Sequence, residues 1–412
     1  MVAIVIFAWQ RMASLQRVVN SLLAAEYCGF KVTLIIILDA NPAPAAVEYA
    51  RTGFEWPHGP RRVVTESSPN GIRGMWTRVL TRELERESEA THVLPIEDDI
   101  QVSPLFHWWL RRAAVAYGPF DTAKGSLAVP KLVGVSLYSP RSDEIHYPMR
   151  VWKPRHRQLE SHAACFFFGL PCSWGALYFR EHWRRFIRFY HLRGAPPFYN
   201  FTHEDVQGGS RFDREVLGDP VLGVPNSRHS TWPRSWKKFL IDYMYGRGDV
   251  MLYPSAPLDP QVRHASMSFS TTYMERGDHT GSDGNIEGPQ ANHLRAASTL
   301  DYRKTVPLLL RKHAAIAVRA FSHIPSAEDT TVLSLLHDNV VSIGALQAAG
   351  HNFVNSRAHA AGRRHKNGDR PSAEHGDDMR PCTQLPGSPR PTRAQYENLA
   401  RVWLDDDVNA EQ

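Results

Sequence analysis

Short apolar runs alternate with amphipathic segments over the first 120 residues. Residues 2–7, 31–38 and 92–96 are almost wholly apolar and are short enough for buried strands, whereas 14–26 and 72–88 carry apolar residues at helical spacing. Continuously aliphatic strands separated by helices are typical of a mostly parallel sheet that is covered on both faces. The sequence therefore predicts an α/β fold.

Three consecutive acids, Glu97, Asp98 and Asp99, follow the apolar run that ends at Ile96. Ligands of open α/β sheets bind at the edge where the parallel strands end. Three neighbouring carboxylates repel each other unless positive charge shares the space, and a divalent cation with a phosphate-bearing substrate would supply it. The alternative is an acidic loop that caps the following helix, residues 104–117.

Polar residues also follow the first two strands. Arg11 lies in the turn after the first strand, and Asp39 ends the second. Asp39 suits hydrogen bonds from a nucleobase or a ribose, or else it caps the helix after Asn41. Arg73 lies in a Gly-containing loop, residues 70–74, where a phosphate at a helix N-terminus and ordinary turn chemistry both explain the glycines.

Several function classes are excluded by motif and charge. No G-x-G-x-x-G follows the first strand, and no G-x-x-x-x-G-K-[ST] occurs, which argues against a dinucleotide site and a P-loop NTPase. The net charge is +6, but residues 355–394 alone hold eight Lys/Arg and four Asp/Glu, so the remaining chain is close to neutral. A nucleic-acid binder should carry its basic face on folded elements. We therefore expect no nucleic-acid partner.

The sequence has neither a signal peptide nor a membrane span. No apolar run reaches the ~18 residues of a span. Met1 leads directly into the first strand without a basic region before it. We expect either a soluble, unexported protein or a chain that lacks an upstream anchor.

Together these features resemble the nucleotide-sugar half of a GT-A glycosyltransferase, in which an Arg-containing turn follows the first strand, Asp ends the second, and a D-x-D-type motif follows the fourth. Residues 96–104 are close to the E-D-D variant of the N-acetylglucosaminyltransferase I family. Four further segments resemble a plant and protist group of uncharacterised glycosyltransferase-like proteins: 170–179, 235–245, 250–254 and 268–271. The resemblance covers roughly residues 2–280.

The resemblance implies a nucleotide-sugar donor, a glycan or glycoprotein acceptor, and a divalent cation, Mn²⁺ or Mg²⁺, bound by Asp99. The donor side of such a site consists of the polar residues at the strand ends: Arg11, Asp39, Arg73, Glu97 and Asp98. A Golgi or ER lumen location with membrane attachment is also implied, although the lack of an anchor in this chain leaves a soluble cytoplasmic location open.

One segment departs from the family pattern. The W-D-D-W segment, in which an Asp acts as the base, falls on Trp236–Phe239, and here Lys237 and Lys238 take the acidic positions. A general base must reach the acceptor hydroxyl. The candidate bases are the acids of the acceptor side: Asp242, Glu204 and Asp205. The alternatives are a solvated helix acid for the first and a solvated loop for the other two.

Trp174 and Gly175 are candidates for acceptor or sugar binding, because a Gly beside an aromatic residue lets a sugar ring approach the backbone and stack on the indole. The alternative for Trp174 is core packing. His264 and His279 are further candidates for the metal shell, with a structural histidine as the alternative in each case.

We predict a GT-A fold, which is Rossmann-like with a mostly parallel central sheet and helices on both faces, followed by a C-terminal helical and disordered extension. The expected divisions are a nucleotide-sugar-binding half (1–120), an acceptor-side half (121–280), a helical extension (281–351) and a largely disordered tail (352–412). The functional prediction is a metal-dependent glycosyltransferase. Its rivals are a catalytically inactive GT-A-like binding protein, which the two lysines favour, and a cation-dependent nucleotidyltransferase.

Overall fold

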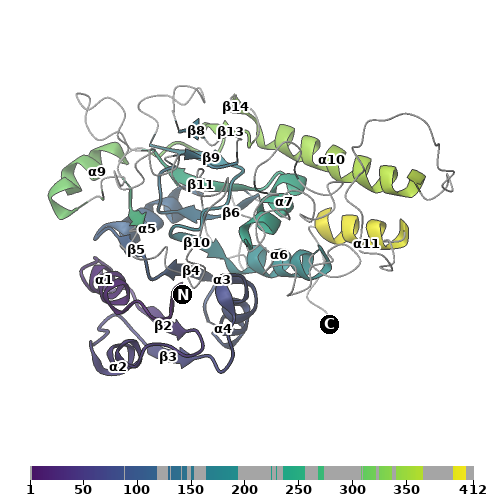
Figure 1. Ribbon diagram of the computed structural model, residues 1–412. Helices are drawn as coiled ribbons and strands as arrows, with labels where there is room; N and C mark the ends of the chain where they lie inside the picture. Colours follow the sequence, from purple (N-terminus) through teal and green to yellow (C-terminus); the bar gives the residue numbers. More distant parts are fainter. Residues whose placement is uncertain are drawn as a thin grey trace.

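The computed structural model (Figure 1) describes residues 2–87, 89–117, 129, 131–140, 142–145, 150–152, 164–193, 224, 229, 235–255, 268–272, 308, 310–321, 324–335, 340–364 and 393–404. Within these residues, ten strands form one sheet in the order β14 (Val340–Val341), β13 (Val332–Leu333), β9 (Cys165–Phe168), β11 (Val250–Pro254), β6 (Leu132–Ser136), β10 (Ala176–Phe179), β4 (His92–Glu97), β1 (Val2–Ala8), β2 (Val32–Leu38) and β3 (Arg61–Thr65). Two small strand pairs lie outside it: β5 (Ile100–Val102) with β12 (Ser270–Thr272), and β7 (Ser142–Asp143) with β8 (Arg150–Val151).

The helices that the structure describes are α1 (Met12–Leu23), α2 (Pro44–Thr52), α3 (Gly71–Gly74), the π-helical turn η1 (Met75–Val79), α4 (Leu80–Arg86), α5 (Phe106–Tyr117), α6 (Arg180–Arg193), α7 (Lys237–Arg247), the 3₁₀ turn η5 (Arg311–His313), α9 (Ala314–Ala320), α10 (Ile343–Arg364) and α11 (Arg393–Leu404).

The sheet is mostly parallel. Strands β3, β2, β1 and β4 are parallel to one another, as are the neighbours β6 and β11. Strand β10 runs antiparallel between β4 and β6, so strands from both predicted halves of the chain share one continuous sheet. The predicted division at residue 120 itself lies outside the described residues.

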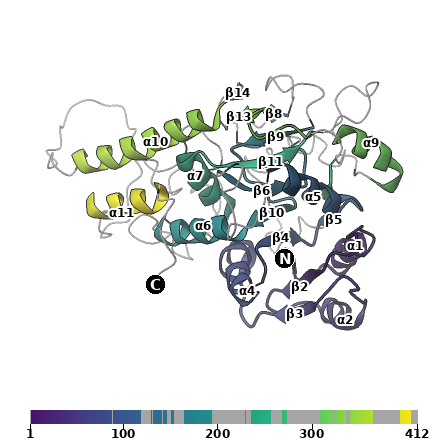
Figure 2. The same cartoon turned by 180° about the vertical axis from the view of Figure 1, so that it is seen from behind.

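Helices cover both faces of this sheet (Figures 1 and 2). Ile4 and Ile6 of β1 pack into one core with residues of α1, α2, α5 and α9. The alternate residues, Val5 and Phe7, pack into a second core with residues of α4, α6, α7 and α11. This alternation follows from the two-residue period of a strand. The predicted α/β class, with helices on both faces, is confirmed.

The helix expected over residues 72–88 is divided. α3 is followed by the π-helical turn η1, and α4 begins at Leu80. A π turn holds an extra residue per turn and is found often at functional sites. Trp76 lies in this turn and is fully buried.

The C-terminal helices pack on the body of the protein. α10 contacts α7 and α11 contacts α6 (Figure 1), and Val354 and Leu399 are buried there. α10 runs through residue 351, so residues 352–364 are helical, where the sequence analysis expected disorder. Burial of apolar side chains against α7 offsets the ordering entropy, which the local composition does not reveal. Residues 365–392 lie outside the described residues.

None of the described helices has the length and apolar content needed to cross a bilayer.

Candidate functional site

The ends of β1, β2 and β4 bring the predicted polar residues to one edge of the sheet. Phe7 is opposite Glu97 in the parallel pairing of β1 with β4. The backbone N–H of Asp98 donates to the Phe7 carbonyl at 3.0 Å, and that of Asp39 donates to Ala8 at 3.0 Å. The continuous aliphatic strands end here, and the charged residues lie at this edge with different degrees of burial.

Arg11 neutralises one of the three acids. It precedes α1, and its guanidinium forms an ion pair with Asp98, with Nε 3.4 Å from Oδ2. The same guanidinium lies 3.9 Å from Oδ2 of Asp99. The Asp98 side chain is 6% exposed and the Asp99 side chain 29% exposed. Asp99 is therefore the acid that is better placed to meet a ligand from solvent.

Glu97 carries an excess of negative charge around it. Its Oε1 accepts a hydrogen bond from Trp76 Nε1 at 3.0 Å. Burial raises the pKa of Glu97 to about 8, and the charge of Asp99 adds to the rise. The indole hydrogen bond and Arg11 oppose this without cancelling it. The charges of Asp98 and Asp99 both raise the pKa of Glu97, so added positive charge would be favourable beside it.

The described residues contain no group of three His, Cys, Asp or Glu side chains arranged to hold a metal ion. A Mg²⁺ or Mn²⁺ ion that arrives with a diphosphate does not need one, because such ions are bound through one or two carboxylates, with substrate phosphates and water completing the shell. Asp99 supplies a half-buried carboxylate in an acidic setting. The residues present fit a cation that is shared with a phosphate-bearing ligand.

The alternative role of the acids, as a cap for the next helix, is wrong. β5 separates the acids from α5 and pairs with β12. Ser103 takes the capping position instead, since its Oγ accepts from the N–H of Leu105 at 3.0 Å. The acids are left at the sheet edge without this structural duty.

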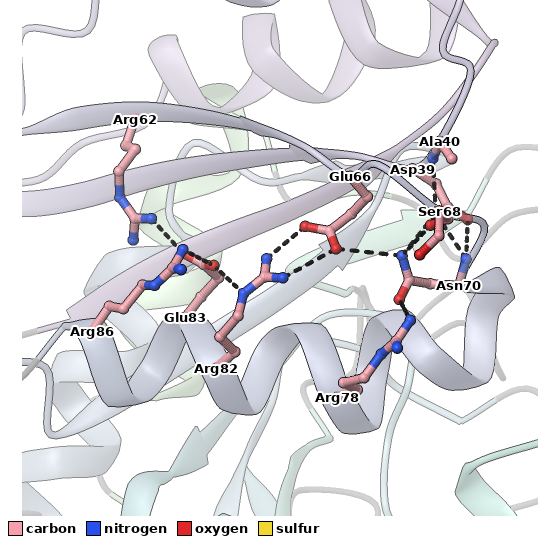
Figure 3. A network of polar contacts seen from close by, with 10 residues as sticks. All are labelled: Asp39, Ala40, Arg62, Glu66, Ser68, Asn70, Arg78, Arg82, Glu83 and Arg86. Atoms are coloured by element: carbon pink, nitrogen blue, oxygen red, sulfur yellow. Dashed lines mark hydrogen bonds and ion pairs between the residues drawn. The ribbon is translucent and has the colours of Figure 1, made fainter.

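Asp39 has a well-defined structural role (Figure 3). Its carboxylate accepts from the backbone N–H of Asn70 and of Gly71, each at 3.0 Å, and from that of Ala40 at 2.9 Å. The Asn70 side chain donates to it as well, at 3.1 Å. Asp39 therefore caps α3, not the helix α2 that follows it in sequence. With these donors on its two oxygens, it has little capacity left for a nucleobase or a ribose.

A chain of ion pairs holds this turn in place (Figure 3). Arg78 donates to the Asn70 side-chain oxygen, and Arg82 pairs with Glu66. Arg82 also contacts the fully buried Glu83, which pairs with Arg62 from β3 and with Arg86. The network joins β3 to α4 and fixes the segment from which Trp76 reaches Glu97.

Arg73 does not lie at a free helix N-terminus. The Asp39 carboxylate already occupies the first amides of α3, so a phosphate cannot use them. The Arg73 guanidinium instead lies 5.8 Å from the centre of the Phe239 ring of α7. Arg73 and Arg193, after the larger effect of burial, lower the pKa of Lys238 to about 7. The Arg73 side chain therefore lies beside α7, and not at the helix N-terminus that Asp39 caps.

Trp9 was missed as a site residue by the sequence analysis. Its indole N–H donates to the Ala40 carbonyl at 2.8 Å, and the residue is 50% exposed. An exposed indole that is tied to the backbone at the strand edge presents a rigid apolar surface beside Arg11. A large aromatic residue directly after the first strand, where core packing ends, was the available signal.

Trp174 and Gly175 are linked through β12 to the strand that follows the acid motif. Ser270 Oγ donates to the Trp174 carbonyl at 2.6 Å, and β12 pairs with β5, which begins directly after Asp99. Gly175 has φ +87°, and a Cβ there would lie 3.1 Å from Ser270 Oγ. The glycine is therefore required by the backbone and by Ser270. The half-buried Trp174 ring contacts Tyr138.

The structure places Asp242 in the interior. It is 5% exposed, and its Oδ1 accepts from the N–H of Val224 at 3.1 Å and lies 2.8 Å from His229 Nε2. The expected alternative, a solvated helix acid, is wrong because α7 is enclosed by α6, α10 and α11. The other predicted bases and histidines lie outside the described residues: Glu204, Asp205, His264 and His279.

No model of a known protein family matches this sequence, and no curated protein matches it. Among solved structures, the chain is similar to the mannosyltransferase PcManGT from Pyrobaculum calidifontis in complex with GDP-Man and Mn²⁺, at 10% identity and a TM-score of 0.31, over 63% of this chain and 58% of that one. It is also similar to GalNAc-T7 with UDP, GalNAc and Mn²⁺, at 12% identity and a TM-score of 0.36, over 62% of this chain and 42% of that one. The chain thus spans about half the length of these proteins, and the likeness concerns the fold alone.

Proposed function

We propose that the chain is a metal-dependent GT-A-type glycosyltransferase that moves a sugar from a nucleotide-sugar donor to an acceptor hydroxyl. The observation that carries the proposal is the acid edge, where a half-buried Asp99 lies beside an Asp98 paired with Arg11 and a Glu97 of raised pKa. The resemblance of residues 96–104 to the N-acetylglucosaminyltransferase I family supports the same assignment. A location in the Golgi or ER lumen stays a prediction.

Each edge residue has a role in this proposal. Asp99 would hold a Mn²⁺ or Mg²⁺ ion, which stabilises the charge that develops on the departing nucleoside diphosphate. Arg11 holds Asp98 in place and adds positive charge near the phosphates. Trp9 provides a surface on which a nucleobase stacks. Asp39 acts indirectly, because it orders the turn that leads to Trp76.

The proposal is tested with Asp99→Asn. Titration calorimetry with UDP and with GDP, each with and without Mn²⁺, should show that the variant loses the cation-dependent affinity while its melting temperature is unchanged. Asp329→Asn is the matched control, since it makes the same chemical change at an exposed acid near β13. Unchanged cation-dependent affinity in a folded Asp99 variant would contradict the metal assignment.

Two other results would replace the proposal. Tight donor binding without turnover for any common nucleotide sugar would indicate an inactive binding protein. Release of pyrophosphate from a nucleoside triphosphate would indicate a nucleotidyltransferase.

A further inference from the structure

The Glu144 carboxylate forms an ion pair with Lys237 at the start of α7. The contact joins Lys237 Nζ to Glu144 Oε1, and the two side chains are 6% and 12% exposed respectively. Glu144 follows β7 and is 93 residues away in sequence, so only the fold brings the two together. The family resemblance leads one to expect an acid at position 237. Lys237 stands there instead, and it contacts an acid, Glu144, from another segment.

Contacts connect this pair to the acid edge on two sides. On one side, Trp236 precedes Lys237 and stacks on Trp76, with ring centres 4.0 Å apart and planes 15° apart. Trp76 in turn donates to Glu97. Two stacked indoles thus separate the ion pair from the acids.

On the other side, the path runs through Trp174. Lys237 Nζ lies 5.2 Å from the centre of the Trp174 ring. The Trp174 carbonyl accepts from Ser270, and the strand of Ser270 pairs with β5 next to Asp99. Chains of contacts therefore link the Glu144–Lys237 pair to Glu97 on one side and, through Trp174 and β12, to the strand that follows Asp99 on the other.

We propose that Glu144 is the general base of the glycosyl transfer, held in position by Lys237; this inference rests on the proposed function. The Glu144 carboxylate takes the proton of the acceptor hydroxyl while the acceptor oxygen bonds to the anomeric carbon. The bond from that carbon to the diphosphate oxygen breaks, and its electron pair leaves with the nucleoside diphosphate. The products are the glycosylated acceptor, the diphosphate and a protonated Glu144.

The position of Glu144 suits a general base better than that of Asp242. A general base must reach the acceptor hydroxyl, and the Glu144 side chain is 12% exposed and held by Lys237, which lies beside the Trp174 ring. Asp242 is buried against His229 and the Val224 backbone. Lys237 holds the Glu144 carboxylate by an ion pair, and the half-buried Trp174 ring beside Lys237 suits the apolar face of an acceptor sugar.

The test is Glu144→Gln, with donor turnover and donor affinity measured separately. We expect turnover to fall by about 10²–10⁴-fold while the Mn²⁺-dependent affinity for the nucleoside diphosphate changes by less than about twofold. Formate added to Glu144→Ala should restore part of the turnover, because a small carboxylate can replace the missing base. Glu181→Gln is the matched control, as it removes a glutamate that pairs with Arg184 on the surface of α6.

A second variant guards against a simple loss of folding. Glu144→Gln leaves Lys237 partly buried without this partner, so Glu144→Gln/Lys237→Met removes both charges; it should restore the melting temperature and leave turnover lost. Turnover within about tenfold of the parent in either variant overturns the inference while the proposed function stands. A parent protein that binds the donor without any turnover also overturns it. A parent that binds no nucleoside diphosphate with Mn²⁺ overturns the proposed function itself.

Discussion

Two buried or half-buried glutamates of this protein, Glu83 and Glu97, have opposite environments. Glu83 is fully buried, yet its pKa is lowered, because hydrogen bonds and charges from Arg62 and Arg82 outweigh the desolvation that burial causes. Glu97 has one indole donor and two acidic neighbours, and burial together with Asp99 raises its pKa to about 8. The arginine partners of Glu83 thus outweigh its burial, whereas burial is the largest cause of the raised pKa of Glu97 and its acidic neighbours add to it.

The comparison separates a structural use of charge from a functional one. In the Glu83 network each acid meets arginines, and the folded state is stabilised (Figure 3). At the acid edge burial and the neighbouring acids raise the pKa of Glu97, so the ionised form of this carboxyl is disfavoured and a nearby cation would stabilise it. A carboxyl group with a strongly raised pKa is an indicator of a functional site, because function can require a group whose ionisation costs stability.

The largest expected effect comes from breaking the balanced network. Glu83→Gln leaves the three arginines without their shared carboxylate and should lower the free energy of unfolding by about 3 kcal/mol at pH 7. This is at the lower end for buried pairs, since Arg62, Arg82 and Arg86 are themselves 32%, 35% and 56% exposed at the side chain. Urea unfolding measures the change.

The sign of the pH dependence follows from the lowered pKa of Glu83. Its stabilisation is present above the unfolded pKa and is lost as the pH falls, so the difference between Glu83→Gln and the parent should shrink in acid. Glu48→Gln, at an exposed position of α2, is the control and should change little. A difference that stays constant down to pH 3 would contradict the role of the ionised carboxylate.

Lys238 extends the comparison to a buried lysine with two arginines, Arg73 and Arg193, near it. Burial, Arg73 and Arg193 lower its pKa to about 7. Below pH 7, Lys238 is protonated in the folded protein, and burial of this charge lowers the free energy of unfolding. Between about pH 7 and 10.5, Lys238 is protonated only in the unfolded chain, so the free energy of unfolding should rise with pH in that window. Lys238→Met should therefore be more stable than the parent at pH 6, by on the order of 2 kcal/mol, and match it near pH 10.5. Thermal unfolding across this range is the measurement, and a variant that is less stable at every pH would refute the penalty.

Glu97→Gln should act in the opposite direction to Glu83→Gln. Because the pKa of Glu97 is raised in the folded protein, its contribution to the free energy of unfolding is most favourable at low pH. This contribution is lost as the pH rises from the unfolded pKa to about 8. The neutral glutamine avoids this loss, so the variant should equal the parent near pH 4 and exceed it by about 1–2 kcal/mol at pH 8 in the presence of a chelator. A Glu97→Gln variant that is less stable than the parent at pH 8 would show that other groups stabilise the ionised Glu97.

Trp9→Ala should produce the smallest effect on stability, because half of the residue is already exposed. Loss of a stacking surface should weaken Mn²⁺-dependent binding of UDP or GDP roughly tenfold. Calorimetry of the variant, with Trp9→Phe as a control that keeps an aromatic face, tests this. Equal affinity for all three proteins would place the nucleobase elsewhere.

Much of the fold could be predicted from local pattern. The aliphatic runs 2–7 and 31–38 form β1 and β2, because short, continuously apolar segments are typical of strands buried on both faces of a sheet. The acids could be placed at the sheet edge for the same reason. The helix expected over 72–88 is found over 71–86, but its π-helical turn, in which Trp76 contacts Glu97 and Trp236, was not predicted from the sequence.

The roles of single residues were harder to predict than the elements that carry them. Asp39 was placed at the right strand end, but its partners are in α3, 31 and 32 residues away. Asp242 was placed on the right helix, but its burial comes from helices that pack around α7, including α10, which lies beyond the range of the family resemblance. Composition predicted disorder for residues 352–364, whereas contacts with α7 keep them helical.

The sequence by itself determined the α/β class, the position of the three acids after β4 and the presence of lysines at 237 and 238, because hydrophobic period and chain order act locally. Only the tertiary structure decided which charges are neutralised: Arg11 at Asp98, the arginines at Glu83, and Glu144 at Lys237. Charge balance depends on distances of a few ångströms between residues 21 to 93 positions apart. Such pairs exist only once the sheet and its helices have formed, which is why the electrostatics of the site followed from the fold.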